Sequence, residues 1–215
     1  MEKLMAVCSP GLEEFTSREL HQLGLEPTGL EFQGSLQDVY RANLHLRSAG
    51  RVLIRLGEFY ASTFPELRRK ASRLSWEKYL PPKRPISLRV ICEKSRLYHE
   101  GAVAERLAGA IGDRLGSPPP MQKYHEDPEG DLPQIIFVRL MNNLCVINVD
   151  SSGPLLHRRG YRLATAKAPL KETLACAMVM ASGWDTAGPF LDPFCGAWTI
   201  PIVAALLARR IAPGG

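Results

Sequence analysis

The residues with the clearest chemical potential form the octapeptide Asp192-Pro-Phe-Cys-Gly-Ala-Trp-Thr199. A short apolar stretch at 189–191 precedes it, and an apolar stretch with helical character follows from Ile200 to Ile211. Nucleotide-binding α/β folds begin with a strand, a tight glycine turn and a helix, and their ligands lie at the carboxyl end of that strand. Gly196 would let a ligand approach the backbone, and the Asp192 carboxylate would accept hydrogen bonds from it. The pattern therefore predicts a small-molecule site, although Trp198 stands where a second small residue is expected.

Two groups of cations are candidates for binding nucleic acid. The first is the basic side of an expected helix, which is either a solvated face or a phosphate contact. The second is His157-Arg-Arg-Gly-Tyr-Arg162, in which guanidinium forks would grip phosphates and the tyrosine would stack on a base. The alternative for this hexapeptide is a linker whose arginines bridge domains through buried carboxylates. The candidate RNA contacts are Arg68, Arg69, Lys70, Arg73, Arg158, Arg159, Tyr161 and Arg162.

The elements expected before residue 60 alternate between strands and helices. A strand at 3–8 precedes a helix that Ser9 would cap and Gly24 would end, and a strand near 28–33 precedes a helix capped by Ser35. A strand at 51–56 completes the set. This order predicts a small ferredoxin-like α+β module.

The next stretch has its own pattern of elements. Thr63-Phe-Pro-Glu66 predicts a capping box and a helix to about Tyr79. A strand from Ile86 and a helix at 103–115, ended by Gly116, come next. Two strands around Asn142-Asn143 predict a hairpin, because asparagine tolerates the positive φ of such turns. Together these elements indicate an α/β layer.

Composition sets broad limits on the class of protein. The 215 residues are 45% hydrophobic and 23% charged, with a net charge of +5 and a pI of about 9.0, which fits a nucleic-acid partner without requiring one. The five cysteines lack CxxC spacing: Cys8, Cys92, Cys145, Cys176 and Cys195. Four of them lie in apolar runs or helices, which predicts small buried residues in a reducing cytosol and not a metal or disulfide framework. No run of 18 apolar residues and no signal-peptide core occurs, so we expect a soluble, cytoplasmic protein without metal.

The octapeptide, extended to Ile202, closely resembles motif I of class I S-adenosylmethionine-dependent RNA methyltransferases that carry a THUMP domain. Residues 157–176 resemble the segment that leads into that domain, and Ser9-Pro-Gly-Leu-Glu-Glu14 resembles the family's N-terminal segment. The resemblance covers the whole chain and is closest to bacterial guanine-N2 methyltransferases of large-subunit ribosomal RNA. Two positions differ: the family usually has glycine where Trp198 stands, and often an acid where Val203 stands.

The resemblance implies an α+β chain with four segments. These are a ferredoxin-like module at 1–60, a THUMP RNA-binding domain at 61–155, a linker at 156–168 and the first part of a Rossmann-like methyltransferase domain at 169–215. A helix from Pro169 to about Ser182 would bury Leu174, Ala177, Met178 and Ala181. The implied S-adenosylmethionine contacts are Asp192, Pro193, Phe194, Cys195, Gly196 and Thr199, with Lys171, Glu172 and Thr173 as weaker candidates.

The family's Asn-Pro-Pro-Tyr-type catalytic motif does not occur in these 215 residues, so no catalytic residue can be named. We therefore expect a truncated chain that is inactive alone, from a parent protein that methylates the N2 amine of a guanine in ribosomal RNA. Three alternatives stay open: a transfer-RNA guanine-N2 methyltransferase, an RNA-binding protein without catalysis, and a DNA adenine methyltransferase.

Overall fold

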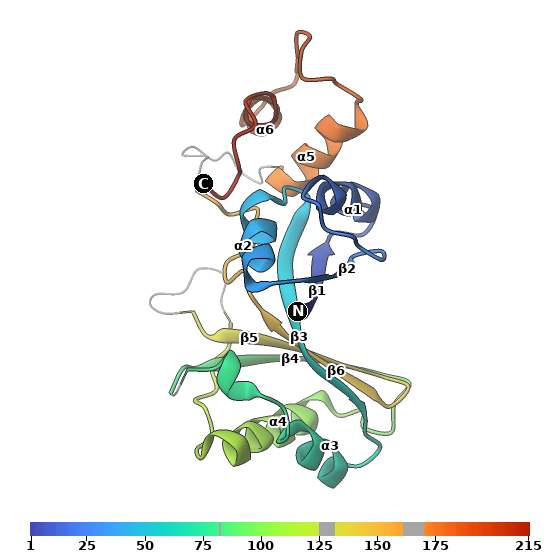
Figure 1. Ribbon diagram of the computed structural model, residues 1–215, viewed down its shortest axis with the longest axis vertical. Coiled ribbons are helices and arrows are strands. Elements are labelled where there is room, and N and C mark those ends of the chain that lie inside the picture. Colours follow the sequence, from blue (N-terminus) through green and yellow to red (C-terminus); the bar gives the residue numbers. More distant parts are fainter. Residues whose placement is uncertain (82, 125–131, 161–169) are drawn as a thin grey trace. The chain divides into compact units, whose positions relative to one another are not determined.

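The computed structural model describes residues 1–81, 83–124, 132–160 and 170–215 (Figure 1). The chain forms two compact units, one of residues 1–53 with 154–215 and one of residues 54–153. Strand β3 contributes residues to both units because it contains the point at which they divide.

The first unit begins with a three-stranded part of the sheet in the order β2-β1-β3, in which β1 and β2 are antiparallel. The capping box predicted at Ser35 is confirmed, since its hydroxyl accepts from the Asp38 N–H and the Asp38 carboxylate accepts from the Ser35 N–H. The elements of this unit are β1 (Glu2–Cys8), α1 (Glu13–Gln22), β2 (Glu31–Gly34), α2 (Leu36–His45), the start of β3 (Ala49–Tyr60), α5 (Glu172–Ala181) and α6 (Thr199–Ala208).

The predicted start of the first helix was wrong. Helix α1 begins at Glu13, with Leu12 at its N-cap and no side chain capping it. Gly11 has a φ of +89°, a left-handed conformation that interrupts a right-handed helix, so the chain makes a turn at Ser9 before α1 begins.

The second unit packs helices against one face of a sheet in the order β3-β6-β5-β4 (Figure 1). Strands β4 and β5 are parallel, whereas β5 and β6 form the predicted antiparallel hairpin around Asn142 and Asn143, whose φ angles are 51° and 64°. Gly116 ends α4 in the left-handed conformation, as predicted. The elements added here are α3 (Phe64–Ala71), a 3-10 turn η1 (Trp76–Lys78), β4 (Ile86–Glu93), α4 (Glu100–Leu115), β5 (Gln134–Met141) and β6 (Leu144–Asp150).

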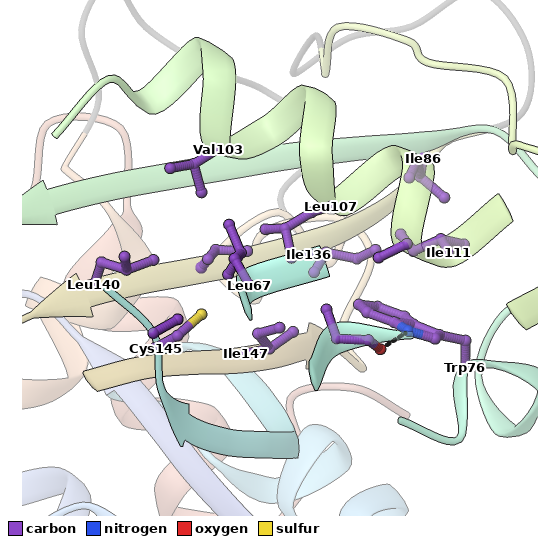
Figure 2. Packing of buried hydrophobic residues seen from close by; sticks show 14 of the residues in the cluster. Leu67, Trp76, Ile86, Val103, Leu107, Ile111, Ile136, Leu140, Cys145 and Ile147 are labelled. Carbon is purple, nitrogen blue, oxygen red and sulfur yellow. Dashed lines mark hydrogen bonds between the residues drawn. The ribbon is translucent and has the colours of Figure 1, made fainter. Parts of the chain in front are cut away.

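The core of the second unit lies between these helices and the sheet. Figure 2 shows Leu67, Leu107 and Ile111 from the helices facing Ile136 and Ile147 from the strands. The spacing of the apolar residues on α4 is that of one helix face, which explains why its prediction was accurate. Burial of the Cys145 thiol in this core raises its pKa to about 12, which keeps it protonated and unreactive.

Helix α3 is shorter than the sequence predicted, ending at Ala71 instead of near Tyr79. The reason is Trp76, which is fully buried and donates its indole N–H to the Ala71 carbonyl at 2.7 Å (Figure 2). Burying this side chain requires the backbone to leave the helix, and the indole then satisfies a carbonyl at the helix end. The Thr63 hydroxyl caps the helix as predicted, but the Glu66 carboxylate accepts from the Ser62 N–H, one residue before the expected donor.

Two details of the C-terminal part were also wrong. The structure assigns no strand to the described residues 189–191, and Phe190 instead packs on Trp184 with ring centroids 4.9 Å apart. Met178 and Ala181, both expected on the buried face of α5, are exposed, Met178 by 54%, while Ala175, Cys176 and Val179 are buried. Because α5 is apolar on most of its surface, its sequence did not specify which face would pack.

Candidate functional site

The octapeptide folds as a turn that leads into α6. The Asp192 Oδ1 atom accepts from the Phe194 N–H at 3.0 Å, and the Trp198 N–H donates to the Cys195 carbonyl at 2.7 Å. Gly196 and Trp198 both have left-handed φ angles, 48° and 63°. Glycine adopts this conformation without strain, whereas tryptophan does so at a cost of about 1–2 kcal/mol.

The second carboxylate oxygen of Asp192 is the atom of greatest chemical interest in this turn. It is buried, and it has no hydrogen-bond partner among the residues that the structure describes. A buried acceptor without a donor is costly unless a ligand or water supplies one. The turn therefore has an unused acceptor of the kind that a ligand's amine or hydroxyl would satisfy.

The side chains of the other predicted cofactor residues differ in accessibility. Phe194 is 92% exposed and Trp198 is 61% exposed, so neither ring is enclosed within the described part of the chain. Thr199 is buried at the first position of α6, and Val203 lies on the buried face of the same helix. The structure thus brings Asp192, Gly196 and Thr199 together on one turn, with the Trp198 ring directed away from the core.

The predicted basic cluster at 68–73 divides into cations with an ion-pair partner and cations without one among the described residues. Arg68 forms a two-pronged ion pair with Asp113 on α4, with N–O distances of 2.7 and 2.8 Å. Lys70 donates to the Glu66 carboxylate and to the Tyr60 carbonyl.

Arg69 and Arg73 are exposed. Their side chains have no ion-pair partner in the described ranges, so these two are the members of the predicted cluster that remain available to a phosphate.

Arg159 binds backbone carbonyls within the first unit. Its Nε donates to the Leu156 carbonyl at 2.7 Å, and its two terminal nitrogens donate to the carbonyls of Leu44 and Leu46 at 2.8 and 2.7 Å. These two carbonyls lie at the C-terminal end of α2, where carbonyls lack helical donors. Arg159 therefore ties its own segment to the C-terminal end of α2 through backbone carbonyls.

Arg158 is exposed, and the predicted contacts Tyr161 and Arg162 lie outside the described residues. A second bridging arginine was not anticipated: Arg47 donates to the carbonyl of Ile211. No sequence signal marks it, because its partner is a backbone atom 164 positions away.

A hollow of about 10 Å³ is lined by Arg47, Arg159, Glu172, Cys176 and Val203, among others. This volume accommodates about one water molecule, so it is too small for an organic cofactor. Burial raises the pKa of the Cys176 thiol to about 12, which excludes a nucleophilic thiolate at neutral pH.

Within the described ranges, no helix is long and apolar enough to cross a bilayer, and no group of three or more potential ligand side chains could hold a metal ion.

Comparison with known proteins matches both ends of the chain to families. Residues 3–53 match the RlmL ferredoxin-like domain, and residues 159–215 match the RMKL-like methyltransferase domain. The chain is thus similar to RlmL at its start and to RMKL-like methyltransferases at its end. The ferredoxin-like prediction is thus confirmed for the first module, and the predicted resemblance of the last segment to a methyltransferase domain is confirmed.

Individual relatives agree with this result. A ribosomal RNA large subunit methyltransferase K/L of Methylococcus capsulatus is 36% identical over 222 residues, which are 97% of this chain and 29% of the relative. A crystal structure described as a predicted N6-adenine-specific DNA methylase, from Listeria monocytogenes, is 38% identical, with a TM-score of 0.86 over 99% of this chain and 57% of that one. SMU.472, crystallised in complex with SAH, is 32% identical, with a TM-score of 0.82 over the same shares.

Among eight curated relatives that the chain matches, it spans from 29% to 56% of their length.

Proposed function

We propose that the protein to which this chain belongs is a methyltransferase that uses S-adenosylmethionine to methylate RNA. The observation that carries the proposal is the turn at 192–199, in which a buried Asp192 oxygen finds no donor among the described residues and lies on the same turn as the left-handed Gly196. The family match of residues 159–215 and the SAH bound by a similar protein support the same conclusion.

The residues of the turn fit this cofactor. The Asp192 Oδ2 atom would accept a hydrogen bond from an amine or hydroxyl of S-adenosylmethionine, and Gly196 would let the cofactor lie against the backbone. Pro193, Phe194, Cys195 and Thr199 complete the proposed contacts, with Phe194 offering an exposed ring. The cofactor supplies an electrophilic methyl group, and the chain's own residues bind and orient it.

The proposed substrate is the N2 amine of a guanine in large-subunit ribosomal RNA. The ribosomal RNA methyltransferase of Methylococcus capsulatus supports ribosomal over transfer RNA. The methylase of Listeria monocytogenes keeps DNA adenine as the second candidate, which the identity of the methylated nucleoside would distinguish. We further propose that residues 61–155 form a THUMP domain, that Arg69, Arg73, Arg158 and Arg162 contact RNA, and that the protein works in the cytoplasm.

The test is transfer of labelled methyl groups from S-adenosylmethionine to RNA by the full-length protein, followed by identification of the modified nucleoside. N2-methylguanosine in large-subunit RNA is the expected product. Methylation of DNA adenine alone would overturn the RNA assignment, and robust activity of residues 1–215 by themselves would overturn the expectation that catalysis needs residues outside them.

The contribution of Asp192 is tested by Asp192→Asn, which retains an oxygen for the Phe194 N–H but replaces the other oxygen with a donor. Asp185→Asn is the matched control, because the Asp185 Oδ1 atom also accepts backbone N–H groups of its own loop. We expect calorimetry to show weakened S-adenosylmethionine binding for the Asp192 variant only; equal losses in both would contradict a direct role.

A further inference from the structure

The loop between β4 and α4 carries two exposed cations. Lys94 and Arg96 are exposed, and within the described ranges neither side chain has an ion-pair partner. On the neighbouring helices, in contrast, Arg68 and Arg114 form two-pronged pairs with Asp113 and Glu77. Exposed cations without an ion-pair partner in the described ranges, such as Lys94 and Arg96, are available for an external anion.

The same loop presents an aromatic side chain to solvent. Tyr98 is 67% exposed, and its ring centroid lies 4.3 Å from that of His99. Leu97, between Arg96 and Tyr98, is 5% exposed and belongs to the hydrophobic core of the unit. This buried leucine anchors the loop, so its neighbours on both sides are held at the surface.

Hydrogen bonds fix the loop to the β5–β6 turn. The Asn143 Oδ1 atom accepts from the Arg96 N–H at 2.8 Å, and the Asn143 N–H donates to the Ser95 hydroxyl at 3.0 Å. The Ser95 hydroxyl in turn donates to the Glu93 carbonyl at 2.9 Å. A loop fixed in this way loses little conformational entropy when it binds a ligand, which favours affinity.

We propose that Lys94, Arg96, Tyr98 and His99, here named the β4–α4 loop surface, bind a single-stranded segment of RNA. The two cations would contact backbone phosphates, and the Tyr98 ring would stack on an unpaired base. Cations beside an exposed aromatic ring are the combination that single-stranded nucleic acid requires, since a duplex hides the faces of its bases. The proposal extends the proposed function by locating part of its RNA contact on a surface outside the cofactor turn.

The experiment measures binding of the full-length protein to a mixed-sequence single-stranded RNA and to the same strand annealed to its complement. Lys94→Gln/Arg96→Gln should reduce the slope of log affinity against log salt by about 1.4, that is by about 0.7 for each single-strand phosphate that the variant no longer neutralises. Tyr98→Leu should weaken single-strand binding roughly 5- to 150-fold.

Matched controls come from elsewhere in the chain. Lys83→Gln/Arg84→Gln removes an exposed lysine and an exposed arginine, as the loop variant does. Lys83 also resembles Lys94 in having a positive φ, 64° for Lys83 and 45° for Lys94. Tyr40→Leu removes a tyrosine that is 66% exposed, nearly the same as Tyr98. These controls should bind RNA as the native protein does.

The outcomes separate this proposal from the proposed function. Native affinity and salt slope in both loop variants, in a protein that still methylates RNA, would overturn the loop surface alone. An equal loss of RNA affinity in the loop variants and in the control variants would overturn the loop surface as well. So would a Tyr98→Leu variant that weakens binding of the duplex as much as binding of the single strand. Absence of any RNA binding or RNA methylation by the native protein would overturn the proposed function itself.

Discussion

Replacing Arg159 separates a structural bridge from an RNA contact. In Arg159→Ala, the carbonyls of Leu44, Leu46 and Leu156 each lose one N–H donor. The Leu44 carbonyl keeps a second donor, the Gly214 N–H at 3.1 Å, whereas fully buried Leu46 belongs to the core. At about 1 kcal/mol for each of the two part-buried bonds, to Leu46 and Leu156, and less for the exposed bond to Leu44, we expect the free energy of unfolding to fall by about 2–3 kcal/mol.

Arg159→Lys tests the geometry of the bridge. A lysine ammonium has three donors but no planar fork, so it can reach one of these carbonyls without spanning all three. We therefore expect it to recover about one third of the loss. Arg158→Ala is the matched control, because it removes the same side chain from the adjacent, exposed position.

The assay is urea unfolding, together with hydrogen exchange of the Leu46 amide, which donates to the Ala42 carbonyl at the end of α2. We expect Arg159→Ala to lower the urea midpoint of unfolding and to speed hydrogen exchange of the Leu46 amide. We expect Arg158→Ala to change both quantities little. The reasoning is refuted if Arg159→Ala unfolds at the same urea midpoint as the native protein but loses RNA affinity, since Arg159 would then act on RNA and not on the fold.

Three further predictions concern single side chains. Trp198→Gly should bind S-adenosylmethionine about tenfold or more tightly in the full-length protein, because it relieves a left-handed tryptophan and a bulky ring at the turn; equal or weaker binding by calorimetry would show that the ring is accommodated. The Arg114 guanidinium lowers the pKa of Glu77 to about 2, so this ion pair should stabilise the fold above pH 4.5, the ordinary pKa of a glutamate, and lose that contribution as the pH falls toward 2. In Glu77→Gln, acid unfolding should lack the loss of stability between pH 4.5 and 2. An unchanged acid unfolding profile would contradict the pairing. Trp76→Phe removes the buried donor to Ala71 and should lower the free energy of unfolding by about 1–3 kcal/mol in denaturant titrations, whereas a native midpoint would show that this bond contributes little.

Local features of the sequence predicted most elements correctly. Three features depend on interactions within a few residues, so the local sequence predicts them: the Ser35 capping box, the Asn142-Asn143 hairpin and Gly116 at the end of α4. The glycine turn at 192–199 was likewise visible as a candidate site, because its residue types and their spacing carry the pattern.

Other features depended on contacts between residues far apart in the chain. The burial of Trp76, not local propensity, ends α3, and the packing of the first unit selects which face of the apolar helix α5 is buried. Pairing with Asp113 on another helix sets the availability of Arg68, and the carbonyls of Leu44 and Leu46 engage Arg159. An arginine's sequence neighbours show that it is charged, but only the tertiary structure determines whether its donors are already used, because hydrogen bonds form between atoms that folding brings within about 3 Å.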